Sequence, residues 1–348
     1  MGDVVVLCRE NKLIIQLTHP NLDNNLIEEI EESFNSNLDW SKLIGLIHYH
    51  RIPGPIWINI KKHNIKCGYP HFLYMLSLIH KAQIMRSKEQ IDQLKVICNI
   101  LEENNIPYNL LKGVALSKFL YHDIGSRFSS DIDILISPLL IDKTVSLLKQ
   151  QGFIQGIYSF KLDEVVPASR REILLSSMTS HEIFPMVKRV TGQFINYIQL
   201  DIHFSLDILT NNRTDALVNT FLEDSLREDS GFRIPLWEHH LLFLCNHFYK
   251  EGLQDFKQQI KKGILLYKLL DIHYILTTKK LNTEIINTLI HENSFKKSIY
   301  FTLKYLETLY PFANYPIHSD DYRTDIILPI QISTLEKKEI INSLFSTC

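Results

Sequence analysis

Two aspartates separated by one residue lead into an apolar stretch near the middle of the chain, and this arrangement constrains the fold more than any other feature. Asp131 and Asp133 alternate with the isoleucines of the run 132–136. The β-branched residues of that run favour a strand, and successive side chains of a strand point to opposite faces. Both carboxylates are therefore expected on one face, with Ile132 and Ile134 in the core. The alternative is a solvated carboxylate pair at a sheet edge, because Asp-x-Asp pairs also occur by chance.

Carboxylates that share a face can share metal ions. Magnesium prefers a few carboxylate oxygens together with water and substrate phosphates, and a pair of ions can hold both the attacking and the leaving oxygen of a phosphoryl displacement. The pair Asp131 and Asp133 therefore predicts a site for two Mg²⁺ ions, with a nucleoside triphosphate as co-substrate.

A glycine turn precedes this strand. Residues 106–111 are typical of a short strand that ends at Lys112-Gly113, and residues 114–121 have helical spacing. Backbone N–H groups at a helix start bind phosphate, and glycine permits close approach of the backbone. The turn is therefore a candidate phosphate site. Lys112 could add a positive charge to the phosphates, and the alternative is a solvated turn lysine.

A third carboxylate lies downstream. The run 194–203 alternates and ends with Asp201 and His203 on one face. In a hydroxyl-attack mechanism, Asp201 would hold the catalytic metal and accept the proton of the nucleophile. His203 either contacts substrate or orients Asp201, and the alternative to both is a structural histidine. His181, which precedes Glu182 and an apolar pair, is expected on a strand as a candidate pocket residue.

These central residues resemble the uncharacterised nucleotidyltransferase family, a branch of the DNA-polymerase-β-like nucleotidyltransferase superfamily. The segments that carry the resemblance are Asn105 to Pro107, Leu111 to Leu116, Leu120-Tyr121, Arg127, Ser130 to Leu135, Leu147-Leu148, Gly152-Phe153, His181 with Pro185, and Leu200 to His203. One departure from the wider superfamily concerns the turn, where Val114 follows Gly113 in place of a second glycine or a serine.

The resemblance implies roles for individual residues. Asp131 and Asp133 would bind magnesium, and Asp201 would complete the triad. The residues expected at the nucleotide are Lys112, Gly113, Arg127 and Ser130. The implied fold is α/β (α+β), a polymerase-β-like core with a small mixed sheet and helical flanks.

Helical spacing before and after the centre supports such flanks. We expect a mainly helical N-terminal region at 1–90, the nucleotidyltransferase core at 91–210 and a mainly helical C-terminal domain at 211–348. Within the last of these, residues 211–230 are expected to form a connector.

The expected reaction moves a nucleoside monophosphate group from a nucleoside triphosphate to a hydroxyl or similar acceptor, and pyrophosphate leaves. Relatives of this kind often occur beside genes for natural-product or peptide tailoring, so a small molecule or peptide is the expected acceptor. ATP, GTP, CTP and UTP all stay open as donors. Replacing Asp131 or Asp133 by alanine is expected to abolish turnover with folding nearly intact. Two alternatives use the same residues: a kinase, and a catalytically idle nucleotide- or partner-binding scaffold.

Composition limits the kinds of binding partner and the cellular location that are expected for this chain. A net charge of −2 and a pI near 6.7 argue against long nucleic acid as the main partner, because no global basic field is present. The five cysteines include no Cys-x-x-Cys pair, which argues against a disulfide framework or zinc site and predicts a cytoplasmic protein. No apolar run approaches the ~20 residues of a membrane span, and the segment 1–6 reaches charged residues too soon for an export signal.

Overall fold

The computed structural model describes residues 7–206, 214–228, 231–254, 263–325 and 335–345. Segment 1–6, on which the export prediction rests, lies outside the described residues. The chain divides into two compact units, one made of Met1–Lys81 and Leu244–Cys348 and the other of Ala82–Phe243. Each unit is described by itself, and the three-region division at 90 and 210 stays a prediction.

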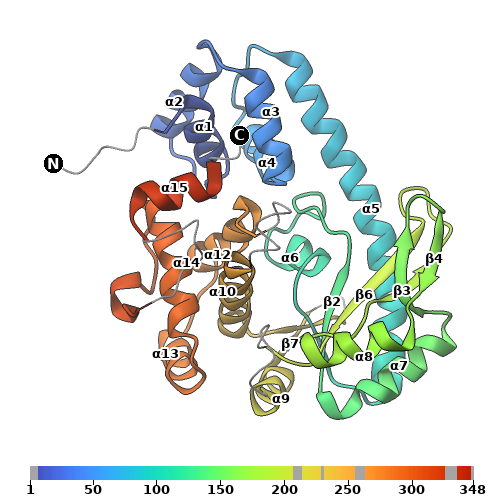
Figure 1. The fold of residues 1–348 in the computed structure, drawn as a ribbon. Coiled ribbons are helices and arrows are strands. Elements are labelled where there is room, and N and C mark those ends of the chain that lie inside the picture. Colours follow the sequence, from blue (N-terminus) through green and yellow to red (C-terminus); the bar gives the residue numbers. More distant parts are fainter. Residues whose placement is uncertain (1–6, 207–213, 229–230, 255–262, 326–334, 346–348) are drawn as a thin grey trace. The chain divides into compact units, whose positions relative to one another are not determined.

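The first unit is helical, as the apolar spacing of both flanks predicted (Figure 1). Aspartate side chains cap two of its N-terminal helices: Asp23 accepts from the N–H of Leu26 at 2.8 Å, and Asp39 accepts from that of Lys42 at 2.9 Å. Its helices are α1 (Arg9–Leu17), α2 (Asn24–Phe34), α3 (Trp40–Tyr49), α4 (Pro53–Lys62), α12 (Leu266–Thr278), α13 (Thr283–Glu292), α14 (Lys296–Leu309) and α15 (Lys337–Phe345), with the short η2 (Ser319–Tyr322).

Two longer helices contribute residues to both units. These are α5 (Pro70–Glu103) and α10 (Trp237–Leu253). Helix α5 begins at Pro70 and continues past residue 90, where the N-terminal region was expected to end, because the apolar spacing around 73–79 belongs to the same helix.

The second unit is built on a six-stranded sheet in the order β1-β2-β6-β5-β3-β4. Strands β2 and β6 are parallel, and the other neighbours are antiparallel, so the sheet is mixed. The strands are β1 (Tyr108–Leu110), β2 (Ile132–Ile136), β3 (Ile154–Ser159), β4 (Glu164–Pro167), β5 (Met186–Arg189) and β6 (Tyr197–His203). This mixed sheet with helices confirms the predicted α/β class.

Short elements lie between and after these strands in the chain. They are α6 (Val114–Phe119), η1 (Pro138–Leu140), α7 (Ile141–Gln150), α8 (Arg170–Thr179), α9 (Asp215–Glu223), and the hairpin of β7 (Ser225–Arg227) and β8 (Arg233–Pro235). The connector predicted at 211–230 therefore contains a helix and a strand, and its residues 211–213 and 229–230 lie outside the described residues.

Alternation along β2 and β6 separates a core face from a polar face. Ile132, Ile134, Leu200 and Ile202 belong to one buried cluster with apolar residues of α5, α6 and α7. The intervening residues of both strands point to the opposite face, so the hydrophobic layer holds the strands that present the carboxylates. In the described residues, no helix is both long and apolar enough to span a membrane.

Candidate active site

The parallel pairing of β2 with β6 brings the predicted carboxylates together. In the register of these strands Asp133 lies directly opposite Asp201. Asp131 precedes Asp133 by two residues and shares its face. The sequence contained both segments, but only the sheet topology makes them neighbours, because the chain between them includes β3, β4 and β5.

Asp133 is the most enclosed of the three. Its side chain is 4% exposed, and its Oδ1 lies 2.9 Å from Lys112 Nζ and 3.0 Å from Nε2 of the fully buried His203. Burial by itself would raise the pKa of Asp133, but the charge of Lys112 and the hydrogen bond to His203 outweigh it and hold the pKa below its usual range. Asp133 is therefore an ionised hydrogen-bond acceptor, and one of its oxygens already contacts both Lys112 and His203.

Asp131 and Asp201 have the opposite electrostatic environment. Burial raises the pKa of Asp131, and the charge of Asp133 raises it further. Burial likewise raises the pKa of Asp201 well above its usual value, together with the charges of Asp131, Glu182 and Asp133. Carboxylates that repel one another in a partly buried site are stabilised by a bound cation, so this donor set fits divalent metal.

A second group of possible ligands adjoins the first. His181, Glu182 and His203 offer donor atoms that all lie within 4.8 Å of one another. Glu182 Oε2 is 3.6 Å from His203 Nε2 and 3.7 Å from His181 Nε2. The strand expected at His181 is reduced to an isolated bridge between Glu182 and His203.

The glycine turn lies beside the aspartates. The N–H of Leu111 donates to the carbonyl of Asp133 at 3.0 Å, which continues the pairing of β1 into the turn. Gly113 has φ 64° and ψ −125°, and a Cβ at this position would overlap the hydroxyl of Ser129. Lys112 contacts Asp133 here, so the reading of this residue as a solvated turn lysine is wrong.

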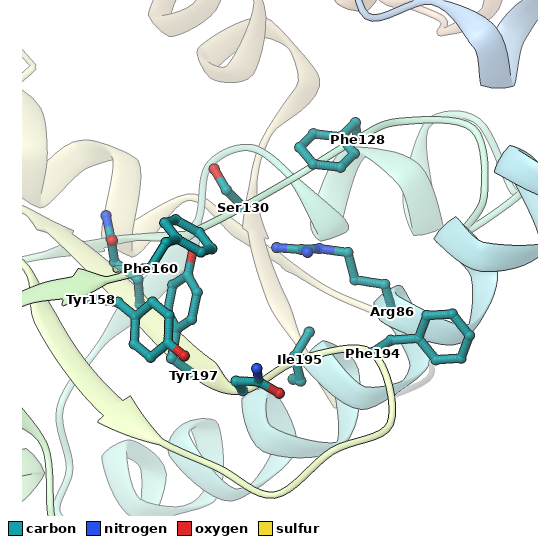
Figure 2. A pocket seen from close by; sticks show the side chains of 10 residues that line it. Arg86, Phe128, Ser130, Tyr158, Phe160, Phe194, Ile195 and Tyr197 are labelled. Carbon is teal, nitrogen blue, oxygen red and sulfur yellow. The ribbon is translucent and has the colours of Figure 1, made fainter. Parts of the chain in front are cut away.

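Arg127 and Ser130 have different surroundings. Arg127 is buried, and its charge lowers the pKa of Asp131, although burial and Asp133 outweigh this effect. Ser130 instead lines a pocket of about 410 Å³ (Figure 2). The lining residues are Arg86, Phe128, Ser130, Tyr158, Phe160, Phe194, Ile195, Asn196, Tyr197 and Gln199.

Three residues of the metal-ligand group and the pocket were not identified from the sequence as part of the site. Glu182 is one, because its position beside His203 depends on a bridge between distant segments. Gln199 is another, although the alternation of Tyr197, Gln199 and Asp201 on one face of β6 was a usable signal. Arg86 lies on a helix whose spacing carried no sign of a site.

A mixed sheet with Asp133 and Asp201 on two adjacent strands, Asp131 directly before one of them and a glycine turn beside it is consistent with the nucleotidyltransferase class. A family model described as uncharacterised nucleotidyltransferase matches residues 36–311. The chain belongs to this family. No curated protein and no solved structure matches the chain.

Proposed function

We propose that this protein is a Mg²⁺-dependent nucleotidyltransferase that moves a nucleoside monophosphate group from a nucleoside triphosphate to a hydroxyl on a small molecule or peptide. The observation that supports this most strongly is the pairing of Asp133 opposite Asp201, with Asp131 on the same face. Family membership supports the class of reaction.

The three aspartates have the hard oxygen donors that magnesium prefers, and Asp131 and Asp201 have neighbouring negative charge that a dication would neutralise. Asp131, Asp133 and Asp201 would therefore hold the metal. When bound, Mg²⁺ neutralises phosphate charge and favours deprotonation of an acceptor hydroxyl.

The protein's own groups act on both reactants. The acceptor oxygen forms a bond to the α-phosphorus while the bond from that phosphorus to the bridging oxygen of pyrophosphate breaks. Asp201 takes the hydroxyl proton. The backbone at Gly113 can approach the phosphates closely because it lacks a Cβ, and Lys112 adds a positive charge next to Asp133.

Label transfer tests this reaction against the kinase and the idle scaffold. The protein, Mg²⁺ and a nucleoside triphosphate are incubated with a pool of small hydroxyl compounds and peptides. We expect label from the α-phosphate to reach an acceptor as pyrophosphate appears, and Asp201→Asn to abolish the transfer. Asp142→Asn, an exposed aspartate on α7, is the matched control. Transfer of label from the γ-phosphate with nucleoside diphosphate as product would instead identify a kinase.

A further inference from the structure

The proposed reaction assigns no role to the aromatic pocket next to the aspartates. We propose that it binds the acceptor, and that the acceptor carries its hydroxyl on or beside a planar aromatic ring that also bears an anionic group. This inference rests on the proposed function, since it assigns the second substrate of the same site.

The pocket walls are suited to stacking. Tyr158 and Tyr197 are parallel at 4.2 Å between ring centroids, and Phe160 meets them edge-on at 5.3 and 5.9 Å. We call these three residues the ring cluster. The side chain of Phe160 is 81% exposed and that of Phe128 is 47% exposed. Aromatic faces left in water at the mouth of a pocket are typical of a ligand site that completes their burial.

The positive charge of Arg86 in the pocket favours an anionic substituent on the aromatic ring of the acceptor. Arg86 extends between Phe128 and the ring cluster (Figure 2). Its Nε donates to the carbonyl of Ser129 at 3.2 Å, and its guanidinium lies 5.2 Å from the Phe128 ring centroid. Among the described residues, neither Nη group of Arg86 has a hydrogen-bond partner. Since the ten lining residues include no acidic side chain, these Nη groups favour a carboxylate or phosphate.

The position of the pocket assigns it to the acceptor rather than to the base of the donor. Gln199 lines the pocket and donates through Nε2 to Oδ1 of Asp201 at 3.0 Å. Asp201 is the residue that takes the acceptor proton in the proposed reaction. The turn at Gly113 follows β1, whereas Tyr197 and Gln199 lie on β6, on the other side of β2 in the sheet. The ring cluster and the phosphate turn therefore flank β2 from opposite sides.

Hydrogen bonds from α5 fix one wall of the pocket. The carboxylate of Glu89 accepts from the backbone N–H groups of Gln193, Phe194 and Ile195 at 2.9 to 3.2 Å. Arg86 precedes Glu89 by one helical turn and bonds Ser129, so α5 ties together the segments that lead into β2 and β6. The wall is held in place before a ligand arrives, which lowers the ordering cost of binding.

Binding of three matched probes tests the inference: N-acetyl-tyrosine, N-acetyl-tyrosinamide and N-acetyl-serine. Titration calorimetry or ligand-observed NMR gives their affinities in the absence of nucleotide. We expect N-acetyl-tyrosine to bind about tenfold more tightly than either of the others, because one of them lacks the anionic group and the other lacks the ring.

Variants locate the effect in the pocket. Phe160→Ala should weaken N-acetyl-tyrosine about tenfold, and Arg86→Gln should remove its advantage over the amide. Phe312→Ala, at a 98% exposed aromatic residue, and Arg170→Gln, at an exposed arginine on α8, are the controls and should change neither affinity. Equal binding of the three probes, or unchanged binding in Phe160→Ala, overturns the inference.

Nucleotide titrations separate this inference from the proposed function. If Phe160→Ala weakens a nucleoside triphosphate analogue as much as the ring probe, and the two compete, the pocket holds the donor base and the acceptor assignment is wrong. Nucleotide binding that depends on Asp201 but not on Phe160 supports the assignment. If the protein binds N-acetyl-tyrosine but binds no nucleotide, the proposed transfer reaction is wrong and only the binding site for an aromatic ring is supported.

Discussion

Lys112 Nζ lies 2.9 Å from Oδ1 of Asp133, and both side chains are largely withdrawn from solvent, at 15% and 4% exposure. His203 Nε2 contacts the same oxygen at 3.0 Å. A carboxylate of the proposed catalytic triad is therefore also the counter-charge of an enclosed lysine.

Removing this carboxylate should destabilise the protein. Asp133→Asn removes the carboxylate charge that pairs with the Lys112 ammonium, and we expect the free energy of unfolding to fall by about 3 kcal/mol. The double variant Lys112→Met/Asp133→Leu, which removes both charges, should recover much of this loss. Urea unfolding measures both. A double variant less stable than the single variant would contradict the ion pair's role.

The predicted loss of stability in Asp133→Asn differs from the expectation, drawn from the sequence, that Asp133 can be replaced with folding nearly intact. The sequence places Lys112 in a turn, and nothing in its neighbours shows that the turn points this side chain at Asp133. The contact depends on the antiparallel register of β1 against β2. Asp201→Asn is therefore the cleaner variant for testing activity, because the described contacts of Asp201 include no ion pair with a buried cation.

Gly113 should tolerate no side chain. At φ 64° an alanine is strained, and its Cβ would overlap the Ser129 hydroxyl and lie 3.2 Å from the Asp131 carbonyl. We expect Gly113→Ala to lower the free energy of unfolding by about 2 kcal/mol. Gly45→Ala is the control, and its effect on the free energy of unfolding should have the opposite sign. The exposed Gly45 lies within α3, and a Cβ at this position would meet nothing within 4 Å. Gly45→Ala should stabilise by about 0.5–1 kcal/mol. Thermal unfolding compares the two, and equal stability of Gly113→Ala and the unsubstituted protein would contradict the overlap.

Two histidines of the first unit should make the protein sensitive to mild acid. His50 accepts from the N–H of Leu266 at 3.2 Å, His273 bonds Tyr315 at 2.7 Å, and burial lowers the pKa of each to about 3. Between pH 6.5 and pH 3 these two histidines are protonated in the unfolded chain but neutral in the folded chain. Their contribution to the free energy of unfolding is therefore fully present above pH 6.5 and is lost as the pH falls. At pH 5 each histidine should cost on the order of 2 kcal/mol.

Urea midpoints at pH 7 and pH 5 measure this loss. His50→Gln should make the dependence on pH shallower, whereas His71→Gln, at an exposed histidine, should leave it unchanged. The slope is the test rather than the stability at one pH, because His50→Gln also alters packing. A slope that is the same in His50→Gln and in the unsubstituted protein would contradict the assignment.

The imidazoles near the aspartates should affect which metal is preferred. After chelation with EDTA, nucleotide binding should require added metal. Mn²⁺ should restore it at a lower concentration than Mg²⁺, because imidazole is a better ligand for transition metals and His181, Glu182 and His203 gather their donor atoms within 4.8 Å. In His181→Ala this advantage of Mn²⁺ should shrink. An unchanged Mn²⁺ to Mg²⁺ ratio in that variant would exclude His181 from the metal site.

How far the sequence predicts this molecule depends on the range of the interactions involved. The strand 132–136 has the bounds of β2 because alternation and β-branching are local signals. The pairing of Asp133 with Asp201, the bridge of Glu182 to His203 and the placement of Arg86 all depend on contacts between distant segments. Local patterns carry no information on these contacts, so the contacts could not be predicted from the sequence.

The most direct test of the proposed function is titration calorimetry of the protein with non-hydrolysable ATP, GTP, CTP and UTP analogues, with and without Mg²⁺, alongside Asp201→Asn and the control Asp142→Asn. We predict that at least one analogue binds only with Mg²⁺, that Asp201→Asn weakens it at least tenfold, and that Asp142→Asn leaves it unchanged. Binding that is independent of Mg²⁺ and of Asp201, or no binding by any analogue, would contradict the assignment of these aspartates to a nucleotidyl-transfer site.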